Sequence, residues 1–185
     1  MPRLIHINGP PAIGKSTIAE RYTADHPGTL LLDIDRVRML VGGWQQGFVG
    51  VGELVRPLAL AMVQAHLTGG HDVVMPQYLG DLREIEAFEH VVTAAGAEFV
   101  EVVLMDDAES IVQRFAERGS GSDDELLDVI ASTVSSSGGP AYLRALHDEL
   151  SDAVASRERA IVVQSTPGDP ERTYRDLLTA LADDR

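Results

Sequence analysis

The sequence of 185 residues contains no cysteine, which excludes disulfides, zinc–thiolate sites and a cysteine nucleophile. Basic residues are also scarce, because 15 Lys and Arg stand against 29 Asp and Glu, for a formal net charge of −14. An acidic surface disfavours binding along a nucleic-acid backbone, which needs clustered cations. We therefore expect no nucleic-acid partner, although a small phosphate in a locally basic cleft is compatible with this charge.

Long apolar runs are missing as well. No segment approaches the roughly 20 uninterrupted apolar residues that cross a bilayer. The N-terminus, Met1-Pro2-Arg3, leads into a short apolar strand and not into a signal-peptide core. We expect a cytoplasmic protein without membrane contact. The length suits a single domain covering residues 1–185, as a monomer or a homodimer.

Short apolar segments alternate with segments of helical periodicity. Strands are expected at 4–7, 29–33, 72–75, 99–105 and 160–164, and helices at 15–24, 53–68, from 81, at 107–118, 124–134 and 141–156, and from 169. Leu54, Leu58, Met62 and Ala65 form one apolar stripe along the second helix. Such alternation is typical of parallel βαβ units, and it predicts an α/β fold with helices on both faces of the sheet.

Lysine is the rarest charged residue, since the chain has fourteen arginines and one lysine, Lys15. That lysine lies in Gly9-Pro10-Pro11-Ala12-Ile13-Gly14-Lys15-Ser16, followed by Thr17, which matches G-x-x-x-x-G-K-S in full between a strand and a helix. Glycines let successive N–H groups turn toward phosphate oxygens, and the following helix adds its positive dipole end. We expect this segment to bind ATP, with Lys15 on the β- and γ-phosphates and the Ser16 hydroxyl on Mg²⁺.

The second strand runs into Asp33-Ile34-Asp35-Arg36-Val37-Arg38, at the edge of the sheet where α/β proteins bind ligands. Asp35 is a candidate base for an attacking hydroxyl, and Arg38 a candidate to hold the acceptor or the transferring phosphoryl group. Asp33 and Asp35 point to opposite sides if this segment is extended. The alternative is that all three are ordinary loop charges or helix caps.

After the third strand the chain reads Pro76-Gln77-Tyr78, without the carboxylate that often contacts Mg²⁺ at this position. Ser16 is therefore the one metal ligand we assign, with Asp33 or Asp35 acting through water as an alternative.

Arg114 and Arg118 are four residues apart and precede the segment 119–123, which is expected to be a loop. They are candidates to close over the phosphates, Arg114 in nucleotide binding and Arg118 in catalysis. A solvated helix face, with Glu117 and Asp107 as partners, is the alternative. The loop 165–169 after the last strand is a candidate to border the adenine.

In the order of these features the chain resembles the small P-loop kinases that include gluconate kinase, shikimate kinase and chloramphenicol phosphotransferase. The resemblance rests on the P-loop, the D-x-D-x-x-R segment, the Arg-x-x-x-Arg helix and the Ser165-Thr166-Pro167-Gly168-Asp169 loop. It implies a three-layer P-loop NTPase fold with a five-stranded parallel sheet of order 2-3-1-4-5, ATP and Mg²⁺ at the P-loop, and a helical lid at about 114–156. It also implies Asp35 as the acceptor base.

Three functions fit the sequence. The first is an ATP-dependent kinase that phosphorylates a hydroxyl of a small molecule. The second is a nucleotide, nucleoside or nucleotide-sugar kinase, in which Arg36, Arg38 and Arg56 would supply the additional phosphate site. The third is a P-loop ATPase or nucleotide-dependent switch without an acceptor.

Overall fold

The computed structural model describes residues 1–118 and 124–183, in which five strands form one parallel sheet. The strand order is β2-β3-β1-β4-β5, which confirms the predicted 2-3-1-4-5 arrangement. The strands are β1 (Arg3–Asn8), β2 (Leu30–Leu31), β3 (Val73–Pro76), β4 (Glu98–Met105) and β5 (Ile161–Gln164). All residues of β1 and β3 are buried, because helices cover both faces of the sheet.

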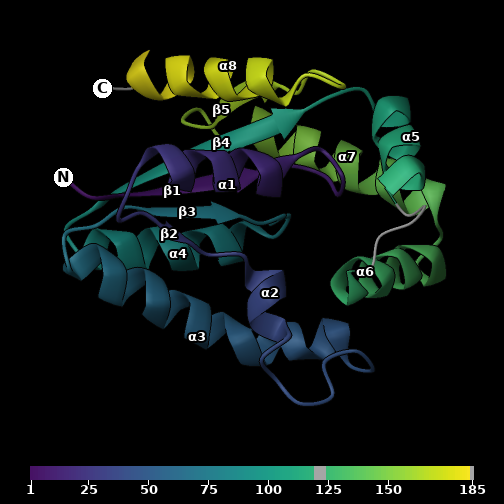
Figure 1. Ribbon diagram of the computed structural model, residues 1–185, viewed down its shortest axis with the longest axis horizontal. Helices are drawn as coiled ribbons and strands as arrows, with labels where there is room; N and C mark the ends of the chain where they lie inside the picture. Colours follow the sequence, from purple (N-terminus) through teal and green to yellow (C-terminus); the bar gives the residue numbers. More distant parts are fainter. Residues whose placement is uncertain (119–123, 184–185) are drawn as a thin grey trace.

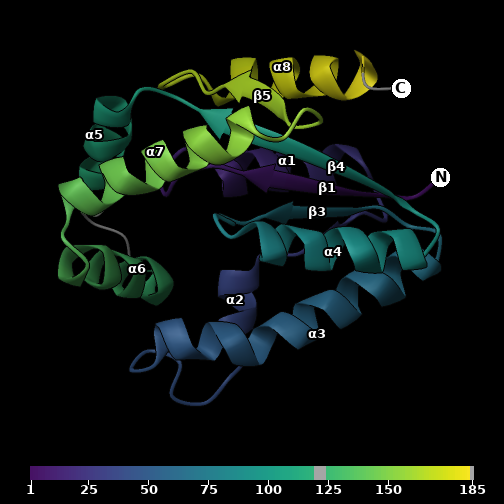
Figure 2. The same ribbon diagram turned by 180° about the vertical axis from the view of Figure 1, so that it is seen from behind.

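The helices form a layer on each side of the sheet (Figures 1 and 2). One side carries α1 and α8 and the other α3, α4 and α7 (Figure 2). Bounds are α1 Lys15–Asp25, α2 Ile34–Arg38, α3 Phe48–Thr68, α4 Leu82–Ala94, α5 Ala108–Arg118, α6 Glu125–Ser136, α7 Pro140–Ala155 and α8 Pro170–Asp183. The expected loop at 119–123 lies outside the described residues.

Helix α3 buries a different face from the apolar stripe that the sequence indicated. Its buried stripe is Val51, Val55, Ala59, Val63 and Leu67. The stripe expected from periodicity is exposed, with Leu54 at 64%, Leu58 at 53% and Met62 at 38% of their full accessibility. Both faces of this helix are apolar, so a helical period alone does not determine which of them meets the sheet.

By length and mean hydropathy α3 also meets the criteria for a membrane-spanning helix, although it contains no uninterrupted apolar run of about 20 residues. Glu53 and Arg56 are its two Asp, Glu, Lys or Arg residues, and two such charges do not lower the mean hydropathy enough to fail the test. A core helix of a water-exposed domain passes the same test. Here Arg56 forms an ion pair with Glu84 of α4, and α3 packs against α2 and α4.

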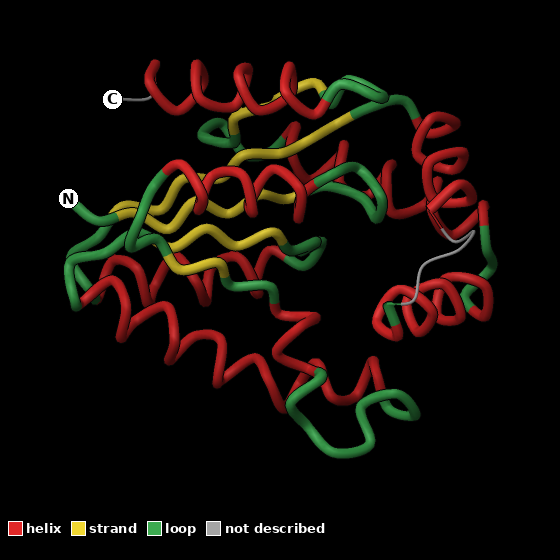
Figure 3. Tube along the Cα trace, in the orientation of Figure 1, coloured by secondary structure: helices red, strands yellow, loops and turns green. Residues whose placement is uncertain are grey.

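The carboxyl ends of the strands point to one end of the molecule, where α2, α5 and α6 gather beyond the sheet (Figure 3). In parallel α/β sheets this edge is where ligands bind. The residues predicted for the site lie in or next to segments that leave this edge, namely the loop after β1, the helices α2 and α5, and the loop after β5.

Candidate active site

The loop between β1 and α1 has the backbone of a phosphate-binding loop. Gly9 has φ 150°, and a Cβ at this position would lie 2.8 Å from the carbonyl oxygen of Leu104 on β4. Gly14, the N-cap of α1, has φ 104°. Only glycine adopts such angles without strain, and at Gly9 only glycine fits against β4. The two glycines of the motif therefore have backbone roles in forming the loop.

Asn8, the last residue of β1, fixes the entrance to this loop. Its Oδ1 accepts hydrogen bonds from Gly9 N at 2.9 Å and Leu79 N at 3.1 Å, and its Nδ2 donates to Leu79 O at 3.0 Å. The side chain thus ties the P-loop to the segment after β3. Sequence reasoning missed Asn8, although a polar residue directly before the motif, at the end of an apolar strand, is a usable signal.

Lys15 lies across the loop that precedes it. Its Nζ donates to Gly9 O at 2.7 Å and Pro10 O at 2.9 Å. Burial lowers the pKa of Lys15 to about 8, which the Asp35 carboxylate opposes and the Arg118 guanidinium reinforces. Lys15, Ser16, Thr17 and Arg118 line one hollow, together with Ala12 and Gly14. Two cations, two hydroxyls and a helix N-terminus in one hollow are the groups that favour binding of an anion.

Arg114 lies outside this hollow, against the other side of the P-loop. Its Nη1 donates to Ile13 O at 3.2 Å and to Ser165 Oγ at 2.9 Å, and its Nη2 lies 3.1 Å from Asp106 Oδ2. Ser165 Oγ in turn donates to Ile13 O at 2.9 Å. Arg114 therefore connects the P-loop to the ends of β4 and β5, whereas Arg118, one turn further along α5, lines the phosphate hollow.

Asp33 and Asp35 both line a second, larger cavity that adjoins the hollow. Opposite orientations were expected for an extended segment, but β2 ends at Leu31 and α2 begins at Ile34, so the backbone turns between the two residues. Asp33 caps α2, since its Oδ1 accepts from Asp35 N at 3.0 Å and Arg36 N at 3.3 Å. Burial raises the pKa of Asp33, and the nearby Asp35 carboxylate raises it further.

Arg38 extends from α2 along the start of α3. Its guanidinium lies 4.4 Å from the centre of the Phe48 ring, and its Nη1 lies 3.4 Å from Asp35 Oδ1. The space that it occupies exists because residue 52 is glycine, since a Cβ there would lie 2.9 Å from Arg38 Nη2. Phe48, Gly52 and Asp35 together hold the arginine at the wall of the cavity.

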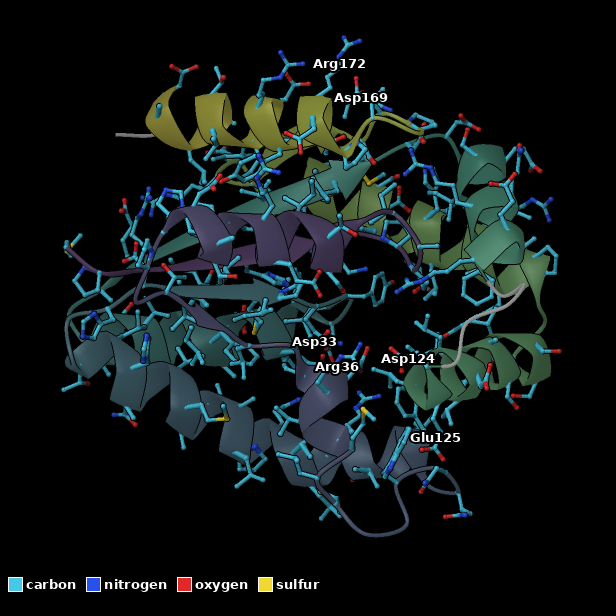
Figure 4. The ribbon with its side chains drawn as sticks, in the orientation of Figure 1. Asp33, Arg36, Asp124, Glu125, Asp169 and Arg172 are labelled. Carbon is cyan, nitrogen blue, oxygen red and sulfur yellow. The ribbon has the colours of Figure 1, made fainter. Side chains whose placement is uncertain are left out.

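The larger cavity has a volume of about 650 Å³ and reaches from the P-loop to α6 and α7. Lys15, Ser16 and Arg118 line it as well, so the phosphate hollow and the cavity are continuous. Figure 4 shows Asp33 and Arg36 on one side and Asp124, at the start of α6, on the other. A phosphate site that opens into a second cavity has room for two ligands placed next to each other.

Residues 4–134 match the model of a protein family described as "AAA domain". The chain is also 31% identical, over 134 residues, to an adenylate kinase from Synechococcus sp. (strain RCC307). That match covers 66% of this chain and 72% of the relative. The chain belongs to the AAA-domain family of small P-loop kinases.

Solved structures show the same fold for this P-loop kinase over nearly its full length. A gluconokinase from Sinorhizobium meliloti 1021 superposes with a TM-score of 0.65 at 17% identity, covering 98% of this chain and 93% of that one. A tunicamycin resistance protein from Deinococcus radiodurans superposes with a TM-score of 0.61 at 14% identity, covering 97% and 95%. At these identities the likeness concerns the fold alone.

Proposed function

We propose that this P-loop kinase transfers the γ-phosphoryl group of ATP to a hydroxyl of a small-molecule acceptor. The observation that carries the proposal is the continuity of the phosphate hollow around Lys15 with the cavity that contains Asp35 and Arg38. Direct transfer needs the donor and the acceptor side by side in a site that limits access of water. A nucleotide-dependent switch needs no second cavity, so the cavity favours a kinase over this alternative.

In the proposed reaction the acceptor oxygen forms a bond to the γ-phosphorus while the bond from that phosphorus to the β–γ bridging oxygen breaks, releasing ADP. The hydroxyl proton passes to a carboxylate of the chain. Asp35 suits this role better than Asp33, because one oxygen of Asp33 accepts two backbone N–H groups as the cap of α2. Arg118 and Lys15 would stabilise negative charge on the phosphoryl oxygens.

Residues of the hollow and of the adjoining cavity also fit Mg²⁺, which takes oxygen ligands. Ser16 offers a hydroxyl, and Asp33 and Asp35 are two carboxylates whose mutual repulsion a divalent cation would relieve. Within residues 1–118 and 124–183, no three His, Cys, Asp or Glu side chains gather to hold a metal ion. The nucleotide would therefore have to supply part of the coordination. When bound, Mg²⁺ would neutralise charge on the phosphates.

A nucleotide acceptor is the second candidate. The observation that favours it is the 31% sequence identity to an adenylate kinase. Both candidates predict phosphorylation of an acceptor. An ATP consumption assay with Mg²⁺, with and without a fractionated metabolite extract, separates them from an acceptor-free ATPase. We expect ADP release to depend on the extract, with a product 80 mass units heavier than one of its components, the mass of an added phosphoryl group. Lys15→Ala is the control. ADP release that no fraction changes would contradict the kinase assignment.

A further inference from the structure

The acceptor side of the cavity contains three arginines, and each is paired with a carboxylate. Arg36 lies 2.7 Å from Asp124, Arg38 lies 3.4 Å from Asp35, and Arg56 pairs with Glu84. Arginines that bind a phosphate offer it their N–H forks, and here one nitrogen of each guanidinium already contacts a carboxylate. Among the described residues, the remaining cations of the lining, Lys15 and Arg118, belong to the phosphate hollow of the P-loop.

The wall opposite these arginines is apolar. Helix α6 contributes five apolar side chains to it, and α7 contributes Tyr142 and Leu146. The five are Leu126, Leu127, Ile130, Ala131 and Val134. A sugar acid carries hydroxyls along both sides of its carbon chain, and against this wall one side would lose its hydrogen bonds to water without replacement. An acceptor with an apolar face gains from the same contact.

Two residues of the lining, Gln77 and Arg38, each have one buried polar atom without a hydrogen-bond partner among the described residues. The atoms are Oε1 of Gln77, a residue that is 8% exposed, and Nε of Arg38. A buried polar atom without a partner is costly, so a shift of either side chain that brings this atom to the cavity surface would let a ligand supply the missing hydrogen bond. Gln77 Oε1 requires a donor such as a hydroxyl or an amide N–H, and Arg38 Nε requires an acceptor such as a carbonyl or an ether oxygen.

From these three observations we infer the class of the acceptor: a phosphate-free alcohol with a broad apolar face and a further polar group that contacts Gln77 and Arg38. Aromatic or branched aliphatic diols, and alcohols that carry an amide, meet this description. Nucleotides and sugar acids do not. The inference rests on the proposed function, because it assigns the cavity to the acceptor of the phosphoryl transfer.

The inference can be tested without knowing the natural acceptor. The full chain would be labelled at its isoleucine methyl groups, and spectra recorded with 3-phenylpropane-1,2-diol, AMP or gluconate in the presence of an unreactive ATP analogue and Mg²⁺. Ile130 reports on the apolar wall and Ile13 on the P-loop. We expect the diol to shift the Ile130 signal in a saturable way, and AMP and gluconate to leave it unchanged at the same concentrations.

Two variants of α6 make the test specific. Ala131→Asp places a charge on the cavity wall, and we expect it to weaken binding of the diol by about tenfold or more. Ser132→Asp adds the same charge at the next, exposed residue, and should leave binding unchanged. Saturable binding of AMP or gluconate at Ile130, no binding of the diol, or equal effects of the two variants would overturn the inference. Failure of the ATP analogue to shift Ile13 would instead overturn the proposed function itself.

Discussion

Arg36 Nη2 lies 2.7 Å from Asp124 Oδ2, so a side chain of α2 contacts the residue that begins α6, 88 positions later in the chain (Figure 4). A second bond, from Gln45 Nε2 to Glu125 Oε1 at 3.0 Å, joins the same two parts of the molecule. Together they hold the apolar wall of the cavity opposite Asp35. Asp124 also caps α6, since its Oδ1 accepts from Leu126 N at 3.1 Å.

The two roles of Asp124 can be separated by substitution. Asp124→Asn keeps a capping oxygen and removes the ion pair, which is partly exposed to solvent and contributes about 0–1 kcal/mol. Asp124→Ala also removes the cap, at a further cost of about 1 kcal/mol. We expect both variants to raise KM for the acceptor, and only Asp124→Ala to lower the melting temperature clearly. Equal melting temperatures for the two variants would show that the cap contributes nothing.

Asp35 is predicted to accept the proton of the attacking hydroxyl. Asp35→Asn should lower kcat by roughly 10²–10⁴-fold, the usual contribution of a positioned base, with little change in the affinity for ATP. Asp33→Asn is the matched comparison, because the amide oxygen can still cap α2 and its loss of charge affects the metal instead of the proton. We expect the loss of kcat in Asp33→Asn to become smaller as the Mg²⁺ concentration rises. The loss of kcat in Asp35→Asn should not depend on the Mg²⁺ concentration. Near-normal kcat in Asp35→Asn would exclude Asp35 as the base.

Much of this architecture follows from the sequence because it depends on local pattern. The P-loop motif fixes two glycine positions and the start of α1, and the buried strands are continuous apolar runs. The features that were not predicted depend on contacts between distant segments. The position of Arg114 is determined by Asp106 and Ser165, which are close to it only in the folded chain. Nothing in the local pattern distinguishes it from Arg118.

The segment after β2 was not predicted for a different reason, because two local patterns compete there. Its alternation of Asp and apolar residues is compatible with a longer strand, yet Asp33 caps a helix of five residues. The backbone N–H groups of Asp35 and Arg36 donate to the Asp33 carboxylate and favour the helix, and both carboxylates then line one cavity. In α3 the apolar pattern is equally strong on two faces, and only packing against the sheet and α4 selects the buried one.

Affinity for ATP should depend on pH through Lys15. Its pKa in the folded chain is about 8, so the amine loses its charge at a lower pH than an exposed lysine does. The charged form binds the triphosphate, and affinity should therefore be constant below pH 7 and fall above pH 8, by up to about tenfold per pH unit. Lys15→Ala should bind ATP weakly with no such fall between pH 7 and 9. Calorimetric titration at several pH values measures the ATP affinity of the wild-type chain and of Lys15→Ala. An affinity of the wild-type chain that does not change with pH would contradict the lowered pKa.

Gly52 should determine the position of Arg38. In Gly52→Ala the new methyl group would lie 2.9 Å from Arg38 Nη2, which is the mobile end of a long side chain, so the arginine is displaced and the helix is kept. We expect normal folding, unchanged affinity for ATP and a several-fold higher KM for the acceptor.

Gly50→Ala is the matched control in the same helix, because a Cβ there meets no atom within 4 Å. Replacing a helical glycine by alanine stabilises a chain by up to about 1 kcal/mol. Gly50→Ala should therefore melt at a higher temperature with unaltered kinetics. If both variants raise KM equally, the helix backbone and not the position of Arg38 controls acceptor binding.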